Sequence, residues 1–183
     1  MKKIVLYYTD RYCGKGSHQL LMRAASLYSS LPVDSFQIVS ILGKKPYFSN
    51  YPEIHFSISH SENLWICAFA EDEVGVDVQI LSSDRPWSKL AERFFSTEEA
   101  DTVKNANDTA STFSRIWSRK EAVVKLLGIG IEGSFATFST LSDTLRFKDE
   151  DIFLRDFVPD IRKNLSAAIA YFHNFELEIL KLI

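Results

Sequence analysis

The chain has 183 residues, of which 46% are hydrophobic and 13% aromatic, and its formal net charge at pH 7 is −3. That length and composition support one domain of ordinary size, or two small fused halves, with a core that needs no disulfides. The weak negative charge excludes a global basic field of the kind that attracts nucleic acid.

Location and partners are constrained by features that the sequence lacks. The apolar run at residues 4–8 is too short for a signal peptide, and no segment approaches the roughly 20 apolar residues that span a bilayer. Cys13 and Cys67 are interpreted as free thiols of a reducing compartment. We therefore expect a cytoplasmic protein that binds neither nucleic acid nor membranes.

The N-terminal part of the chain is predicted to form a strand, a helix and a second strand. Residues 4–8 are apolar and β-prone, and residues 36–42 have the same character. Residues 17–31 carry apolar side chains at helical spacing, with Ser17 as the expected N-cap.

Three further strands are predicted, joined by short polar turns. Residues 54–59 and 74–79 alternate between apolar and polar side chains, and residues 64–70 are almost continuously apolar. The acidic turn at residues 71–73 is interpreted as solvated. Strands with such short connections predict an antiparallel meander.

The meander would bring distant polar groups together, because its first and third strands run in the same direction. Ser59 and His60 would then lie beside Asp77 and Gln79. Hydroxyl and imidazole groups at a strand end can bind phosphate, although turn residues of no function would look the same. Asp77 taken alone is more often a surface aspartate, but with a second carboxylate it could bind Mg²⁺.

The chain becomes helical after these strands. A short helix is predicted at residues 86–94, and Ser96 with Glu99 forms a capping box that opens another. The longest predicted helix covers residues 112–127 and ends at Gly128. The remainder of the chain is strand-like with polar breaks.

The long helix carries a candidate catalytic group. Lys120 lies in the middle of its apolar stripe, where a lysine is costly unless it is paired or reaches solvent. Glu121 lies on the flank of the stripe and Lys125 one turn further on. A plain Glu121–Lys125 salt bridge is the simpler interpretation, but Asp77 and Glu121 together would supply the carboxylate pair that Mg²⁺ favours.

Two glycine-containing segments each allow a functional and a structural interpretation. Lys44 and Lys45, between Gly43 and a proline, can hold an anionic ligand, and they would also suit a solvated turn. The pattern GxGxxG at residues 128–133 follows a helix and not a strand, so we interpret it as a helix stop and a close-approach loop.

Five motifs in this order and spacing resemble the signature set of the phosphopantetheinyl transferases. They cover about residues 43–131, and in chain order they are Gly43-Lys44-Lys45-Pro46-Tyr47, Phe56-Ser57-Ile58-Ser59-His60-Ser61, Gly75-Val76-Asp77-Val78-Gln79, Arg93-Phe94-Phe95-Ser96 with Glu99, and Trp117-Ser118-Arg119-Lys120-Glu121-Ala122-Val123-Val124-Lys125 with Gly128-Ile129-Gly130. The third resembles the family's G-[IV]-D-[IV]-E and the last its W-[ST]-x-K-E-[AS]-x-x-K…G-x-G. The length is closer to the surfactin-synthetase-activator type than to the small trimeric acyl-carrier-protein synthases.

The resemblance implies an α+β fold of two pseudo-equivalent α/β halves, with antiparallel sheets and packed helices. The halves would be residues 1–80 and 81–183, with the active site at their junction, and the protein would be a monomer. It also implies transfer of the 4′-phosphopantetheine group of coenzyme A to a serine of an apo acyl or peptidyl carrier protein. Adenosine 3′,5′-bisphosphate would be released, and the carrier would serve fatty-acid, polyketide or nonribosomal-peptide biosynthesis.

The resemblance further implies roles for the acidic residues. Asp77 and Glu121, with Gln79 as a third oxygen donor, would hold Mg²⁺, or alternatively Mn²⁺, on the pyrophosphate of coenzyme A. Glu121, directly or through water, would accept the proton of the carrier serine. Lys125 would neutralise phosphate oxygens, and Glu99 is carried over as a candidate third acid.

The remaining implied roles concern coenzyme A binding. Ser59 and His60 would bind its phosphates, and Lys45 would contact its nucleotide end. Lys120 would anchor the ligand or pair with Glu121.

The sequence departs from the family pattern at Gln79, where the family has glutamate. An amide oxygen can still bind a cation, but the site loses one negative charge. This keeps open a catalytically weakened coenzyme A-binding module that acts as a sensor or subunit. A different Mg²⁺-dependent phosphotransferase or hydrolase, acting on nucleotides without a carrier protein, is the third hypothesis.

Overall fold

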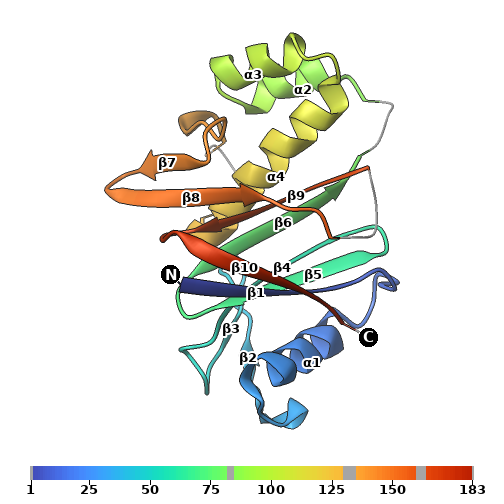
Figure 1. The fold of residues 1–183 in the computed structure, drawn as a ribbon, viewed down its shortest axis with the longest axis vertical. Coiled ribbons are helices and arrows are strands. Elements are labelled where there is room, and N and C mark those ends of the chain that lie inside the picture. The colour runs from blue at the N-terminus through green and yellow to red at the C-terminus, as the bar shows by residue number, and fades with distance from the viewer. Residues whose placement is uncertain (1, 82–84, 130–134, 160–163, 183) are drawn as a thin grey trace.

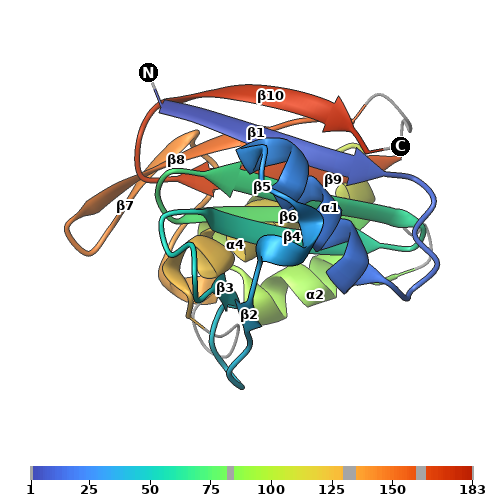
Figure 2. The same cartoon turned by 90° about the horizontal axis from the view of Figure 1, so that it is seen from below.

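The computed structural model describes residues 2–81, 85–129, 135–159 and 164–182. Two four-stranded sheets pack face to face, with one helix on the outside of the first sheet and helices on the outside of the second (Figures 1 and 2). The elements in chain order are β1 (Lys2–Thr9), α1 (Ser17–Ser29), η1 (Val33–Ser35), β2 (Ile38–Val39), β3 (Tyr47–Phe48), β4 (His55–Ser61), β5 (Leu64–Ala70), β6 (Val74–Ile80), α2 (Trp87–Phe94), α3 (Thr97–Lys104), α4 (Thr109–Leu127), η2 (Phe135–Thr137), β7 (Thr144–Phe147), β8 (Glu150–Asp156), β9 (Leu165–Tyr171) and β10 (Phe175–Lys181).

The first sheet has the strand order β10-β1-β5-β4 and the second β6-β9-β8-β7. Pairing is antiparallel except between β1 and β10, which run parallel from the register Lys2↔Phe175. The predicted α+β class, with antiparallel sheets and packed helices, is confirmed. The division into equivalent halves at residue 80 stays a prediction.

Three apolar clusters hold these layers together. The central cluster lies between the sheets and combines alternate residues of β1, β5, β6 and β9. The opposite face of the first sheet packs on α1, and that of the second packs on α2 and α4. All seven residues of β5 are buried because both of its faces are covered, which explains its continuous apolar sequence.

The predicted meander is wrong in its third strand. β4 and β5 pair as expected, but β6 joins the second sheet by pairing with β9 from Val74↔Tyr171 to Ile80↔Leu165. The apolar face of β6 is buried as the alternation predicted, against the facing sheet and not as an extension of it. Hydrophobic alternation along a strand predicts that one of its faces is buried. That face is buried equally well when the strand belongs to a second sheet stacked on the first as when it pairs within the first sheet.

β4 and β6 nevertheless run side by side in the same direction, joined by serine hydroxyls. The Oγ atoms of three alternate β4 residues accept hydrogen bonds from three alternate backbone N–H groups of β6: Ser57 from Val76 at 3.1 Å, Ser59 from Val78 at 3.3 Å and Ser61 from Ile80 at 3.0 Å. We call this contact the serine seam. It brings the end of β4 to the end of β6, as predicted, by a different connection.

The helix and the second strand predicted in the N-terminal part of the chain are confirmed only in part. The helix α1 is present, but its N-cap is Gly16 and not Ser17, whose hydroxyl accepts from Trp65 Nε1 at 2.8 Å. The strand predicted at residues 36–42 is reduced to the two residues of β2.

The helical region follows the sequence more closely. The capping box of Ser96 and Glu99 opens α3, with both of its hydrogen bonds formed. Gly128 ends α4 at a φ of +64°, in the left-handed region that glycine adopts without penalty. The rest of the GxGxxG segment, from residue 130, lies outside the described residues.

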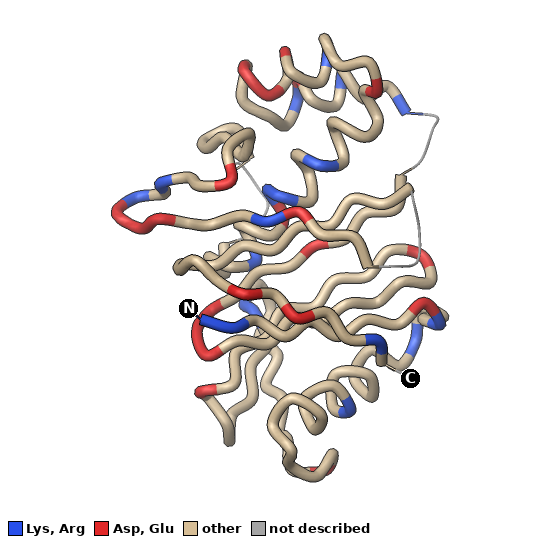
Figure 3. Tube along the Cα trace, viewed as in Figure 1, with Lys and Arg blue, Asp and Glu red and all other residues tan. Residues whose placement is uncertain are grey.

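Two further observations concern the molecule as a whole. Acidic and basic positions are mixed at the helical end formed by α2 and α3 and along the β7–β8 hairpin (Figure 3). Within the described ranges, none of the helices combines the length and the apolar character that a membrane span requires.

Candidate functional site

The candidate site depends on a close approach between α4 and β6. At Gly75, an added Cβ would lie 1.8 Å from the carbonyl oxygen of Ala122 and 2.6 Å from the backbone nitrogen of Leu126. Only glycine fits at that distance, so this residue allows the helix to lie directly on the strand. The charged groups of α4 that follow are thereby placed against Asp77.

Asp77 is buried, with 6% of its surface exposed, and its carboxylate receives two donors. Its Oδ1 accepts from Ser59 Oγ at 2.7 Å and from Lys125 Nζ at 2.7 Å. Ser59 therefore contributes twice, as a link of the serine seam and as a donor to Asp77. The expected convergence of β4, β6 and α4 on one carboxylate is present.

Glu121 lies in the same charged cluster and is 9% exposed. Burial, and then the negative charge of Asp77, raise its pKa to about 7, against the opposing effect of the Lys125 ammonium. The Lys125 ammonium thus pairs with Asp77 and also acts through its charge on Glu121. A further cation between the two carboxylates would remove both the repulsion and the cost of burial, and carboxylate oxygens are ligands that Mg²⁺ favours.

A third metal-binding side chain does not join this pair in the described part of the chain. No group of three or more His, Cys, Asp or Glu side chains is arranged there to hold a metal ion. Gln79 lies two residues beyond Asp77 on β6, where its Nε2 donates to the Ile80 carbonyl at 3.2 Å and its side chain lines an aromatic pocket with Trp87 and Trp117. The donor set therefore fits a cation held by two carboxylates, with water or ligand completing its coordination.

A cavity of about 310 Å³ opens beside the carboxylate pair. Its walls come from the segment before β3, from β4 and from the C-terminal end of α4, and they include Lys44, Lys45, Glu121, Lys125 and Gly128. Three lysines and apolar walls suit a ligand with an anionic part and an apolar or aromatic part.

Lys45 is held in place by the turn before β6. Its Nζ donates to a carboxylate oxygen of Glu73 and to the Val74 carbonyl, and His55 Nδ1 lies 3.1 Å from the other oxygen of Glu73. Burial lowers the pKa of Lys45, although the charge of Glu73 opposes the shift. Burial acts to raise the pKa of Glu73, but the Lys45 ammonium and His55 together oppose it, so that the pKa is lowered.

The acidic turn at residues 71–73 therefore has a structural role that its interpretation as a solvated turn did not include. Glu73 makes structural contacts, whereas Glu71 and Asp72 form exposed ion pairs with Lys2. A partner 28 positions away in the sequence gave no local signal of the Lys45–Glu73 contact.

His60 is exposed on β4, and its ring lies against Tyr12 with the centroids 5.0 Å apart. The cavity walls include the Ser57 side of this strand, two residues before Ser59. The structure thus brings Ser59, Asp77, Glu121 and Lys125 together, and places His60 on the outside of the same strand.

Lys120 and Glu99 form a pair of their own in the interior. Both side chains are 0% exposed, and Lys120 Nζ lies 2.8 Å from Glu99 Oε2. The same ammonium donates to the carbonyls of Phe135 and Phe138 and lies 4.4 Å from the centre of the Phe138 ring. The expected pairing of Lys120 with Glu121 is thus replaced by a pair with Glu99, because Lys120 points toward η2 and not toward β6.

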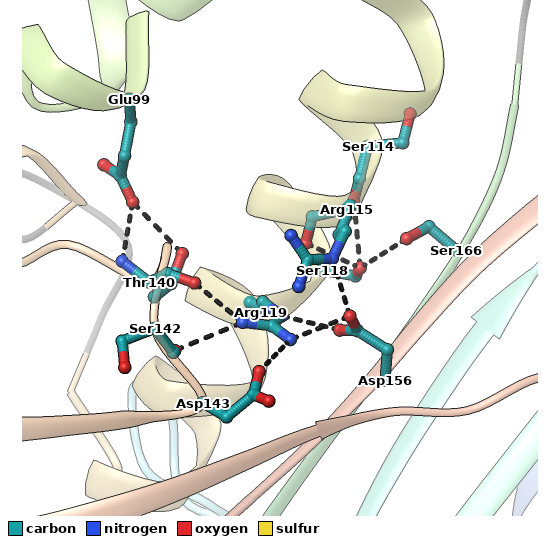
Figure 4. Close-up of polar contacts among 10 residues, drawn as sticks. All are labelled: Glu99, Ser114, Arg115, Ser118, Arg119, Thr140, Ser142, Asp143, Asp156 and Ser166. Carbon is teal, nitrogen blue, oxygen red and sulfur yellow. Dashed lines mark hydrogen bonds and ion pairs between the residues drawn. The ribbon is translucent and has the colours of Figure 1, made fainter. Parts of the chain in front are cut away.

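Arg119 lies within the last of the five motifs, but the sequence indicates no role for it. It is 1% exposed and fans out to five acceptors in Figure 4: both oxygens of Asp156, one of Asp143, and the carbonyls of Thr140 and Ser142. Glu99 accepts from the backbone and hydroxyl of Thr140 in the same view. Two successive cations between the apolar residues Trp117 and Ala122 were the available signal.

Comparison with known proteins gives a family. A family model described as the 4′-phosphopantetheinyl transferase superfamily matches residues 73–176, which include α4 and all four strands of the second sheet. This match covers more than half of the chain and contains Asp77, Glu121 and Lys125.

Several relatives carry the name of the same enzyme. The chain is 37% identical over 98 residues to the 4′-phosphopantetheinyl transferase Sfp of Bacillus subtilis (strain 168), covering 52% of this chain and 42% of that protein. It is 32% identical over 130 residues to a 4′-phosphopantetheinyl transferase of Bacillus pumilus, covering 67% and 54%. It is 33% identical over 104 residues to the 4′-phosphopantetheinyl transferase AcpT of Salmonella typhimurium, covering 55% and 54%.

The chain spans about half the length of these relatives. The family model and the relatives all point to the 4′-phosphopantetheinyl transferases. The buried carboxylates Asp77 and Glu121 and the neighbouring Lys125 are consistent with that family. The chain belongs to the 4′-phosphopantetheinyl transferase superfamily.

Proposed function

We propose that this chain transfers the 4′-phosphopantetheine group of coenzyme A to a serine of an apo acyl or peptidyl carrier protein. Adenosine 3′,5′-bisphosphate would be the second product. The observation that carries the proposal is the buried pair of Asp77 and Glu121, which lies beside Lys125 and opens on a lysine-walled cavity. Membership of the family supports the same reaction.

Asp77 and Glu121 would hold a divalent cation, Mg²⁺ or alternatively Mn²⁺. When bound, the cation would offset negative charge on the transferred phosphoryl group and on the leaving group. Gln79 would add an amide oxygen only by turning from its present contact with the Ile80 carbonyl. We therefore assign the site two protein ligands and leave Gln79 as an optional third.

The remaining groups would bind the anionic substrate and move one proton. Glu121 would accept the proton of the carrier serine, directly or through water. Lys125 would neutralise phosphate oxygens from the cavity wall. Lys45 would contact the nucleotide end of coenzyme A, from the position that Glu73 and Val74 impose on it.

Ser59 would act mainly by orienting Asp77, to which it already donates. His60 is exposed and would bind a phosphate of coenzyme A that extends along the outside of β4. Lys120 and Glu99 are fully enclosed, so we assign both to the framework of α4 and not to ligand contact.

Mass spectrometry of carrier proteins tests the proposal. The purified protein would be incubated with Mg²⁺, coenzyme A and a panel of apo carriers from fatty-acid, polyketide and nonribosomal-peptide systems. We expect one carrier to gain a single phosphopantetheine group with the wild type and none with Glu121→Ala. If no carrier gains mass although coenzyme A binds, the transferase assignment fails for this panel.

The second candidate is a weakened coenzyme A-binding module, and the observation that favours it is Gln79, which supplies no charge to the carboxylate pair. Gln79→Glu separates the two candidates. A rise in turnover from near zero would identify a degenerate enzyme, whereas a modest change would support a working one. A cytoplasmic location, a monomeric state and a division into two equivalent halves at residue 80 belong to the same proposal.

A further inference from the structure

Lys125 lies in an unusual position, because its ammonium is bonded to the carboxylate of Asp77, which the proposed function requires as a ligand of a divalent cation. Lys125 Nζ lies 2.7 Å from Asp77 Oδ1, the same oxygen to which Ser59 donates. Asp77 is almost fully buried, whereas 29% of the Lys125 side chain is exposed. The lysine therefore reaches from the cavity wall into the interior to make this contact.

The charges around the pair leave no room for Lys125 and a divalent cation on the same oxygen. Asp77 and Glu121 contribute two negative charges when ionised, and Lys125 is the cation that the structure places against them. A divalent ion bound to Asp77 would repel an ammonium within hydrogen-bonding distance of its ligand. The Ser59 hydroxyl is neutral and can keep its bond to Asp77, so Lys125 is the group that a cation on Oδ1 would displace.

Once released from Asp77, the Lys125 ammonium can move into the neighbouring cavity. Its side chain lines the cavity with Lys44 and Lys45, and a four-carbon stem can swing its ammonium into that space. There it would meet the anionic part of a ligand. A group that is a counter-ion to Asp77 in one state thus becomes an anion-binding group in the other.

We propose that Lys125 is an internal counter-ion that a divalent cation displaces from Asp77, so that cation binding frees a lysine for phosphate. By reciprocity, a phosphate that draws Lys125 into the cavity exposes Asp77 to the cation. This inference rests on the proposed function for the identity of the two ligands. It also couples the two ligands: binding of the cation favours binding of the anionic substrate, and the reverse, through the position of Lys125.

Metal binding without substrate gives the first test. Mn²⁺ alone would be titrated into the metal-free protein and its variants by isothermal calorimetry, with electron paramagnetic resonance of free Mn²⁺ as a second readout. Lys125→Met should bind Mn²⁺ at least about fivefold more tightly than the wild type, since the internal competitor is gone and couplings of this kind are typically fivefold or larger. Lys44→Met is the matched control: it removes a lysine from the same cavity and should change the affinity less than twofold.

The second measurement follows the lysine itself. A nitrogen-15 spectrum of the lysine ammonium groups should contain a protected signal that is absent from Lys125→Arg. Saturating Mg²⁺ should remove the protection of that signal while the backbone spectrum stays folded. A signal that persists at saturating Mg²⁺ would overturn the inference.

The other outcomes are equally decisive. Equal or weaker Mn²⁺ binding by Lys125→Met, or no measurable Mn²⁺ binding by either protein, would also overturn the inference. If Lys125→Met binds Mn²⁺ more tightly and no carrier is modified by the wild type, the counter-ion role stands and the transferase proposal fails. Carrier modification with unchanged Mn²⁺ affinity in Lys125→Met would give the reverse result.

Discussion

Glu121 should make the metal-free protein less stable as the pH rises, and Glu121→Gln should remove this dependence. The carboxyl has a pKa of about 7 in the folded chain against 4.5 for the ordinary group. The folded state therefore holds the proton more tightly than the unfolded state. For an acid with a raised pKa, stability is fully present below pH 4.5 and is lost as the pH rises toward 7.

The size of the effect follows from that difference. Moving the pKa from 4.5 to about 7 corresponds to roughly 3 kcal/mol of unfolding free energy once the group is fully ionised. Most of this, about 2.5 kcal/mol, falls between pH 5 and pH 8. Glutamine has nearly the same shape and does not ionise, so Glu121→Gln should be the more stable protein at pH 8 by about that amount.

Urea unfolding in the presence of a chelator would measure this at pH 5 and pH 8. Glu150→Gln provides the control, because it removes an exposed carboxylate on β8 and leaves Glu121 in place. Adding Mg²⁺ at pH 8 should stabilise the wild type and not Glu121→Gln, since ligand binding to the folded state adds stability. If the stability of Glu121→Gln relative to the wild type is the same at pH 8 as at pH 5, burial does not raise the pKa of Glu121 and the reasoning is refuted.

Three further substitutions test how α4 is held. Arg119→Met should lower the unfolding free energy by about 1–3 kcal/mol in urea unfolding, because it leaves the buried carbonyl of Thr140 without its donor. Arg115→Met, which removes an exposed contact with Asp156, should cost less than about 1 kcal/mol. Equal costs would show that the five acceptors of Arg119 add nothing. Lys120→Met should cost about 3–5 kcal/mol by calorimetry, because Glu99 is fully buried, and adding Glu99→Gln should recover part of the loss, since no charge then remains unpaired. Gly75→Ala should displace α4 from β6 and so weaken Mn²⁺ binding at least about tenfold in protein that still folds, by analogy with other changes that disturb ligand positioning; unchanged binding would show that the close approach does not position the site.

Much of the fold could be predicted from hydrophobic spacing. Periodicity located the cores of β1, α1, β4, β5, β6 and α4, because each buries at least one face that repeats at its own period. The partner of β6 could not be predicted in this way. Its valine face is equally buried whether the strand extends the first sheet or stacks on it, and only the long-range pairing with β9 decides between them.

The site divides along the same line. Asp77, Glu121 and Lys125 could be predicted to converge because the directions of β4 and β6, and the helical period of α4, each depend on local sequence. The partner of Lys120 could not, since Glu99 belongs to a different helix whose approach is set by packing. The serine hydroxyls of β4 were read as phosphate ligands or turn residues, and nothing local showed that they would replace a backbone ladder.

The contacts of α4 explain why the carboxylate pair persists in a folded chain. Two buried carboxylates repel each other, and the simplest relief would be a small shift of the helix away from β6. Arg119 and Lys120, the two residues directly before Glu121, are bonded to β8 and to residues 135–143 through buried contacts that such a shift would break. Gly75 holds the opposite side of the helix against the strand. The helix therefore cannot relieve the repulsion by moving, and the remaining ways to relieve it are a proton on Glu121, the ammonium of Lys125, or a bound cation.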